Sequence, residues 1–153
     1  DRRPPTLCGD ERDTLLVALA FQRDSFLAKY DGLAAADAER VMVPSATTML
    51  WLLEHLAHAE SGWIVKRSGG EATPPDSTDG DDPLARALAH YRATCAQVDA
   101  VVAEHSLDDP WRGYGEATDV NLRWVLTHLL EEIARHAGHA DILRELIDGT
   151  TGR

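Results

Sequence analysis

Two residues able to bind a metal ion lie one helical turn apart near the end of the chain. In the segment EEIARHAGHADILREL, residues 131–146, Glu132 and His136 are separated by four positions. On a helix, both side chains can therefore reach one ion. His128 stands one turn before Glu132, and His139 follows three positions after His136. On a helical wheel of about 100° per residue, all four side chains fall within the apolar arc, where a carboxylate or imidazole is costly unless it is hydrogen-bonded, paired or bound to a metal.

A third ligand has to come from another helix, and the segment LLEHLAHAESGW, residues 52–63, contains two histidines. His55 shares a sector of the wheel with apolar side chains, whereas His58 is turned about 60° away from it. His55 is therefore the better inward-facing candidate. A His–Glu–His set with an open fourth position is typical of a catalytic zinc site rather than a closed structural one. Imidazole and carboxylate ligands do not single out zinc, so other divalent metals also fit.

The spacing also allows an interpretation in which the polar stripe binds no metal. The histidines could hydrogen-bond to backbone carbonyls, rim a pocket, or form a polar network in the core of a homodimer. His128 is expected behind the ligands, where it would orient them. His139 is either part of a pocket wall or an alternative ligand. His90 and His105, in the preceding helical segment, are expected at the surface.

The opposite side of the last segment is expected to face water. Four charged residues fall there on the wheel: Asp141, Arg144, Glu145 and Asp148. Leu146, by contrast, falls inside the apolar arc and is expected to be buried.

Four segments with apolar residues at helical spacing are predicted to position these side chains. The predicted helices cover residues 10–31, 45–67, 82–105 and 119–148. Ser45 is the expected N-cap of the second helix, and Gly149 closes the fourth. Polar, Pro- and Gly-containing loops separate the later helices, and no alternating strand pattern of useful length appears. The sequence thus predicts an all-α four-helix bundle, as a single domain over residues 1–153 with an N-terminal arm over residues 1–9.

Several aromatic residues are expected near the mouth of the bundle, where they would shield a reaction from water. Trp63 ends the second apolar segment, Trp111 lies in the loop before the last helix, and Trp124 lies near the start of that helix. Packing in the core or in a loop is the competing role for each. Arg123 is a candidate contact for an anionic group, with a surface salt bridge as its alternative, and Tyr114 is a candidate acid.

The charge balance excludes two classes of partner. The formal net charge is −11, from 15 Lys and Arg against 26 Asp and Glu. Binding to nucleic acids or to anionic membranes needs a basic patch, so neither is expected. No apolar run reaches the roughly 18 residues of a membrane span, and no signal peptide is visible. Cys8 and Cys95 form no CxxC pair and are expected to be free thiols in a reducing cytoplasm.

Four segments carry a resemblance to a known family: PPTLCGDERDTLL (4–16), VPSATTMLWLLEHLAHAESGW (43–63), EHSLDDP (104–110) and NLRWVLTHLLEEIARHAGHADILRELIDG (121–149). Over nearly its whole length, the chain resembles the DinB-like superfamily of metal-binding four-helix bundles, in particular its actinobacterial branch of uncharacterised proteins. The resemblance implies that His55, Glu132 and His136 bind a divalent metal, with zinc expected first and nickel as the alternative. Many members have His at the position of Glu132. The His–Glu–His set of this chain resembles that of the mycothiol-dependent maleylpyruvate isomerases. A long crossover connection within the bundle is also implied.

The resemblance further implies chemistry with a low-molecular-weight thiol such as mycothiol, acting as co-substrate beside a small electrophile. A thiol is a weak nucleophile while protonated, with a pKa of about 8.5, and a divalent metal favours its thiolate form. The predicted function is metal-dependent S-transfer to, or isomerisation of, a small electrophile. Two alternatives stay open: a metal-dependent hydrolase that activates water, and a non-catalytic protein that binds a small molecule or metal. The chain is expected to be a monomer or a homodimer.

Overall fold

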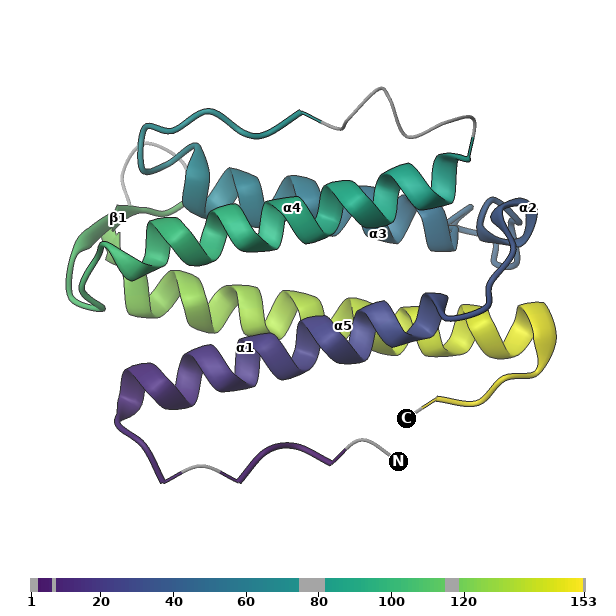
Figure 1. The fold of residues 1–153 in the computed structure, drawn as a ribbon, viewed down its shortest axis with the longest axis horizontal. Helices are drawn as coiled ribbons and strands as arrows, with labels where there is room; N and C mark the ends of the chain where they lie inside the picture. The colour runs from purple at the N-terminus through teal and green to yellow at the C-terminus, as the bar shows by residue number, and fades with distance from the viewer. Residues whose placement is uncertain (1–2, 7, 75–81, 115–118, 153) are drawn as a thin grey trace.

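Four long helices dominate the structure (Figure 1), a computed structural model that describes residues 3–6, 8–74, 82–114 and 119–152. They are α1 (Glu11–Leu27), α3 (Met49–Glu60), α4 (Pro83–Ala103) and α5 (Leu122–Asp148). α1 packs against α5, α3 packs against α4, and α3 also contacts α5. α1 and α5 run in one direction and α3 and α4 in the other (Figure 1), which requires a crossover between α3 and α4. The predicted all-α four-helix bundle is confirmed, and no described helix is both long and apolar enough to cross a membrane.

Capping side chains explain where these helices begin. Each accepts a hydrogen bond from a backbone N–H of the first turn, which has no partner inside the helix. The caps are Asp10, Thr48, Asp82 and Asn121. The prediction that Ser45 caps the second helix is wrong, because its hydroxyl pairs with Thr47 while the extended Thr48 takes the capping position. At the other end of the chain, Gly149 has a φ of 78° and closes α5 as predicted.

Short elements interrupt the predicted helices and loops. A 3-10 helix, η1 (Ala28–Tyr30), and a one-turn helix, α2 (Ala35–Ala38), connect α1 to α3. α3 continues into a π-helical stretch, η2 (Ser61–Val65), inside a range predicted as α-helix. Two short strands, β1 (Pro110–Arg112) and β2 (Asp119–Asn121), pair antiparallel. Each has three residues and is too short to show the alternating pattern that the sequence lacks. Parts of the predicted arm and loops lie outside the described residues, namely 1–2, 7, 75–81, 115–118 and 153.

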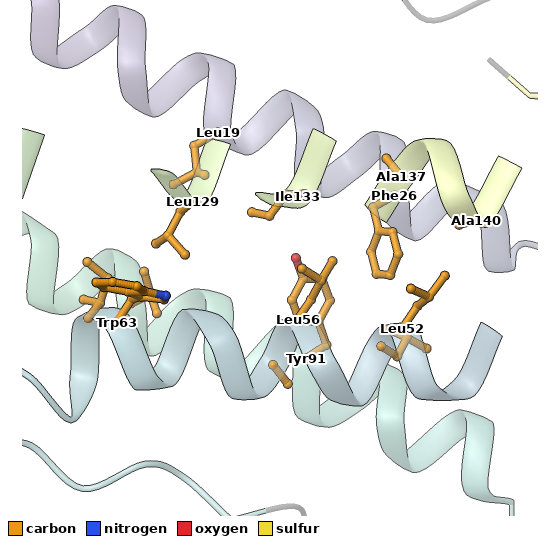
Figure 2. Packing of buried hydrophobic residues seen from close by; sticks show 14 of the residues in the cluster. Leu19, Phe26, Leu52, Leu56, Trp63, Tyr91, Leu129, Ile133, Ala137 and Ala140 are labelled. Atoms are coloured by element: carbon orange, nitrogen blue, oxygen red, sulfur yellow. The ribbon is translucent and has the colours of Figure 1, made fainter. Parts of the chain in front are cut away.

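The hydrophobic core lies where the four helices meet (Figure 2). Phe26 of α1 packs edge-on against Tyr30 and Tyr91, with ring centroids 5.2 and 5.7 Å away. Burying one side chain of this size contributes about 1.5–3 kcal/mol. Leu56 of α3 and Ile133 of α5 are fully buried in the same core, so the two helices that carry the predicted ligands are held together by apolar packing.

A buried ionic network ties three of the helices together. Glu60, at the end of α3, is completely buried and pairs with Arg23 of α1, which also donates to Asp99 of α4 at 2.7 Å. The Tyr91 hydroxyl donates to Glu60 at 2.8 Å. Burial disfavours the charged form of Arg23 and by itself would lower its pKa. The pairing with Glu60 acts in the opposite direction, and the pKa of Arg23 is raised. Burial, with Glu60 nearby, also raises the pKa of Cys95 to about 12, so this thiol stays protonated; both cysteines are free, as predicted.

The C-terminal turns of α5 depart from the predicted wheel. Arg144, predicted to face water, is buried and donates to the carbonyls of Lys29 and Asp31 at 2.7 and 3.0 Å. Leu146, predicted to be buried, is 48% exposed. The reason is that η1 also packs against α5, so a single core direction does not describe the whole helix. Asp141 forms an ion pair with Lys29 at this contact.

Candidate metal centre

The side chains of His55, Glu132 and His136 converge between α3 and α5. His55 Nε2 lies 3.0 Å from Glu132 Oε1, and His136 Nε2 lies 3.2 Å from the same oxygen. One ligand atom from each residue lies within 4.8 Å of the others. The exposed fractions of the three side chains are 30%, 16% and 11%, so the triad is shielded but reachable from solvent. The structure thus brings together the three residues that the sequence singles out as ligands.

Core residues next to the triad fix its position. Leu56 follows His55 directly and Ile133 follows Glu132, and both apolar side chains are 0% exposed. These neighbours set the rotation of each helix, so the ligand side chains emerge at the edge of the core. Glu132 and His136 then lie on the same side of α5, one turn apart, facing His55 on α3.

Trp51 is a further part of this site that sequence analysis missed. Its indole stacks on the His55 ring, with centroids 4.8 Å apart and planes 10° apart, and meets the His136 ring edge-on at 6.4 Å. Trp51 precedes His55 by one turn, and this i, i+4 spacing is the signal that the sequence offers. Since Trp51 is 46% exposed, it covers the imidazoles from the solvent side.

The electrostatics of the triad favour the forms that bind a metal. Burial alone would raise the pKa of Glu132, but the hydrogen bonds and charges of His55 and His136 hold that pKa below its ordinary value. Burial, together with the nearby His55 and His139, lowers the pKa of His136 although Glu132 opposes this. Glu132 is therefore a carboxylate and His136 a neutral imidazole at neutral pH, as metal ligands must be. With two imidazole nitrogens directed at one carboxylate oxygen, these residues fit a divalent ion.

Metal binding is expected to fall as the pH is lowered from about 7.5 to 5, because protonated imidazoles cannot bind a metal. The lowered pKa of His136 means that this residue resists protonation longer than an ordinary histidine. The contribution of His136 to metal binding is therefore complete above a pH of about 6.5, the ordinary pKa of histidine, and is lost only below that pH. Zinc per chain after equilibrium dialysis at a series of pH values tests this. A flat stoichiometry over the whole range contradicts ligation by histidine.

Trp51→Ala is expected to weaken zinc binding by about 2- to 10-fold, since an aromatic pair contributes ~0.5–1.5 kcal/mol. Without the stacked indole, the His55 ring is no longer held in place before the ion binds. Fixing its orientation then lowers the free energy gained on binding. Competition with a chromophoric zinc chelator measures the change in affinity. Trp124→Ala, which removes another exposed tryptophan, is the control and should bind zinc like the unchanged chain. Equal affinity in both variants would show that stacking does not orient His55.

Comparison with known proteins assigns the chain to a family. The sequence model for mycothiol-S-transferase matches residues 14–149, a stretch that includes the whole triad. The chain belongs to the mycothiol S-transferase family. This confirms the DinB-like resemblance. Among solved structures, a conserved protein from Enterococcus faecalis has a similar fold, with a TM-score of 0.73 and 15% identity, over 94% of this chain and 100% of that one. No curated protein matches the chain.

Three further histidines predicted near the site have different surroundings in this member of the mycothiol S-transferase family. His139 Nδ1 lies 3.2 Å from His136 Nδ1, so it is placed to orient that ring from the side away from Glu132. His128 precedes Glu132 by one turn but contacts aromatic rings. His58 is exposed and lines a pocket between α3 and α4.

An aromatic cluster lies at the start of α5 and consists of Trp63, Tyr114, Trp124 and His128. His128 stacks on Trp124 with centroids 5.4 Å apart, and its Nε2 lies 3.1 Å from the Tyr114 hydroxyl oxygen. Trp63 meets His128 edge-on at 4.7 Å. One turn of α5, about 5.4 Å, separates His128 from Glu132 along the helix. The aromatic cluster therefore neighbours the triad.

Two other residues predicted for the pocket make different contacts. Trp111 is 6% exposed, and its indole N–H donates to the carbonyl of Trp63 at 2.8 Å, which anchors the loop before α5. Arg123 donates to Glu11 at 2.7 Å and to Asp108 at 2.6 Å. This is the surface ion pairing considered as the alternative role for Arg123.

Proposed function

We propose that this chain joins mycothiol, through its sulfur, to a small electrophile. The reaction would take place at a divalent metal held by His55, Glu132 and His136. The observation that carries the proposal is the convergence of their ligand atoms within 4.8 Å, in a member of the mycothiol S-transferase family. Zinc is expected first, because two imidazoles and a carboxylate with an open position are typical of catalytic zinc, and nickel is the alternative.

Each residue around the triad has a distinct task. A divalent ion held there would supply the positive charge that favours the thiolate form of the co-substrate. His55 and His136 provide neutral nitrogen ligands, and Glu132 offsets part of the cationic charge, which leaves the sulfur electron-rich. Trp51 and His139 orient the two imidazoles from outside, through the stacking and the 3.2 Å contact described above.

The proposed reaction balances without an oxidant or reductant. The S–H proton of mycothiol passes to solvent, and the sulfur forms a bond to an electrophilic carbon of the second substrate. In a transfer, the leaving group departs with the electrons of the bond that breaks. In an isomerisation, the sulfur adds to a carbon–carbon double bond and is expelled after rotation about that bond. The aromatic cluster offers an apolar wall for the carbon skeleton of such a substrate.

The test is to mix the zinc-loaded protein with mycothiol and a chromogenic aryl halide and to follow the product. We expect turnover that requires mycothiol and that is much slower with cysteine or glutathione. His55→Ala should lose this turnover, whereas the matched His58→Ala variant on the same helix should keep it. Product that forms with zinc but without thiol would support the hydrolase instead, and binding without turnover would support the non-catalytic role.

A further inference from the structure

The pocket that His58 lines, between α3 and α4, has a volume of about 500 Å³. α3 presents His55 to α5, whereas His58 of α3 and Ser61, the first residue of η2, line this pocket. α4 contributes Arg86 and His90 to the facing wall. The pocket is therefore built from different residues than the candidate metal centre, although both sites share α3.

Three buried side-chain polar atoms of the described residues have no hydrogen-bond partner. One of them, Asp141 Oδ1, forms the ion pair with Lys29, and the other two belong to residues that line this pocket. These two are Ser61 Oγ and His90 Nδ1. Ser61 is only 6% exposed. His90, predicted at the surface, is half-buried in the wall of the pocket. Buried hydroxyls and imidazole nitrogens are normally paired, and two such atoms from different helices in one cavity call for a shared partner.

Ser61 differs from Ser25 and Thr127, two other hydroxyl residues inside described helices. Ser25 and Thr127 each donate their hydroxyl to the carbonyl four residues earlier, at 2.8 and 2.9 Å. This local bond is the usual solution for Ser and Thr inside helices. Ser61 lacks it and stands at the first position of the π-helical stretch η2, a feature that is frequent at functional sites. Its hydroxyl in the wall of the pocket therefore has no acceptor within the described residues.

The charges around the pocket favour an anion. One carboxylate faces two cationic side chains and two imidazoles, namely Glu54 against Lys66, Arg86, His58 and His90. Burial lowers the pKa of His90 and favours its neutral form. Lys66 and Arg86 still outnumber the carboxylate of Glu54, which is distinctive in a chain with a net charge of −11.

The outer wall of the pocket is fastened to α4. Gln97 Oε1 accepts hydrogen bonds from the backbone N–H and the hydroxyl of Thr73, at 3.1 and 3.0 Å. Gln97 Nε2 donates to the Glu71 carbonyl at 2.8 Å. Ala72, Thr73 and Pro74 form this wall. These bonds hold the segment over the cavity, so the pocket has a defined shape.

We propose that this pocket binds a small molecule bearing a carboxylate or phosphate, whose oxygens accept hydrogen bonds from Ser61 and His90 while Lys66 supplies a compensating charge. Ser61 Oγ–H and His90 Nδ1–H are the two donors that such an anion would pair. This site is separate from sulfur transfer at the triad and holds whether or not the proposed function does.

Titration of the 153-residue chain with inorganic phosphate and with succinate tests this, with NMR of ¹⁵N-labelled histidine rings as the readout. We expect a saturable shift of the His90 signals with at least one anion and none with succinamide, the neutral analogue of succinate. Saturation by phosphate alone identifies a phosphate-bearing ligand, and saturation by succinate alone a carboxylate.

Two variants separate this site from the triad. Ser61→Ala, a small change that leaves the core packing in place, should weaken binding by about tenfold, since it removes one hydrogen bond to a charged group. His55→Ala should bind the anion like the unchanged chain. The proposal is overturned if neither anion saturates at millimolar concentration, if succinamide shifts His90 equally, or if Ser61→Ala binds with unchanged affinity.

Discussion

Glu132→Ala is expected to abolish stoichiometric metal binding, while Glu131→Ala is expected to leave it intact. The Oε1 atom of Glu132 lies 3.0 and 3.2 Å from the nitrogens of His55 and His136. The neighbouring Glu131 instead pairs with Arg135 on the exposed side of α5. Losing a partner that only orients a ligand costs about 10- to 100-fold in metal affinity, and losing a ligand itself should cost more.

Mass spectrometry of metal content, on protein purified without chelator or a nickel column and then dialysed against zinc, measures the effect. We expect about one equivalent in the unchanged chain and in Glu131→Ala, and under roughly a tenth in Glu132→Ala. Circular dichroism checks that the variants remain helical. Full occupancy in Glu132→Ala would remove this residue from the ligand set. An unchanged chain that takes up no zinc would leave a polar network where we propose a metal centre.

Glu60→Ala is expected to cause the largest loss of folding stability, about 3–5 kcal/mol, because it leaves Arg23 as a buried charge without its main partner. Arg23 is 5% exposed, and Tyr91 would lose the acceptor of its hydroxyl as well. A domain of this size has a total stability of about 5–15 kcal/mol, so the variant should unfold at a much lower urea concentration.

Urea unfolding monitored by circular dichroism gives the change in the free energy of unfolding. Glu54→Ala is the matched control, since Glu54 is an exposed glutamate on the same helix and should change stability by no more than about 0.5 kcal/mol. Replacing Arg23 and Glu60 together by methionine should recover much of the loss, because an apolar pair leaves no unpaired charge in the core. A cost below about 1 kcal/mol for Glu60→Ala would mean that water or rearrangement replaces the ion pair.

The triad could be predicted from the sequence because its members stand beside core residues with a strict helical period. Leu56 and Ile133 fix the phase of their helices, so polar residues inside the apolar arc stand out as His55 and Glu132 do. Periodicity alone does not say which helix faces which, however. The pairing of α3 with α5 is a property of the tertiary fold, and before the structure only the family resemblance implied it.

Other features depend on contacts that local patterns do not encode. Arg144 and Leu146 exchange their predicted environments because η1 packs against α5 from a direction that no helical wheel includes. Ser45 and Thr48 are both good N-caps by residue type. The choice between them follows from the turn at Ala46, which has a φ of 59°. This value is unusual for a residue other than glycine, and an alanine in the sequence does not predict it.

The π-helical stretch η2 has one more consequence, for how substrate preference could change. In an unbroken α-helix, Trp63 would lie about 80° around the axis from His55. The wide turn closed by the bond from Lys66 N to Ser61 O, at 2.9 Å, advances the chain by a smaller angle per residue. Trp63 is thereby brought back towards the side of α3 that carries His55. The position of the indole thus depends on this wide turn. If residues 61–65 were wound as a regular α-helix of the same length, Trp63 would turn away from the side of His55 and the apolar wall would change shape, while the two helices would still present the same three ligands.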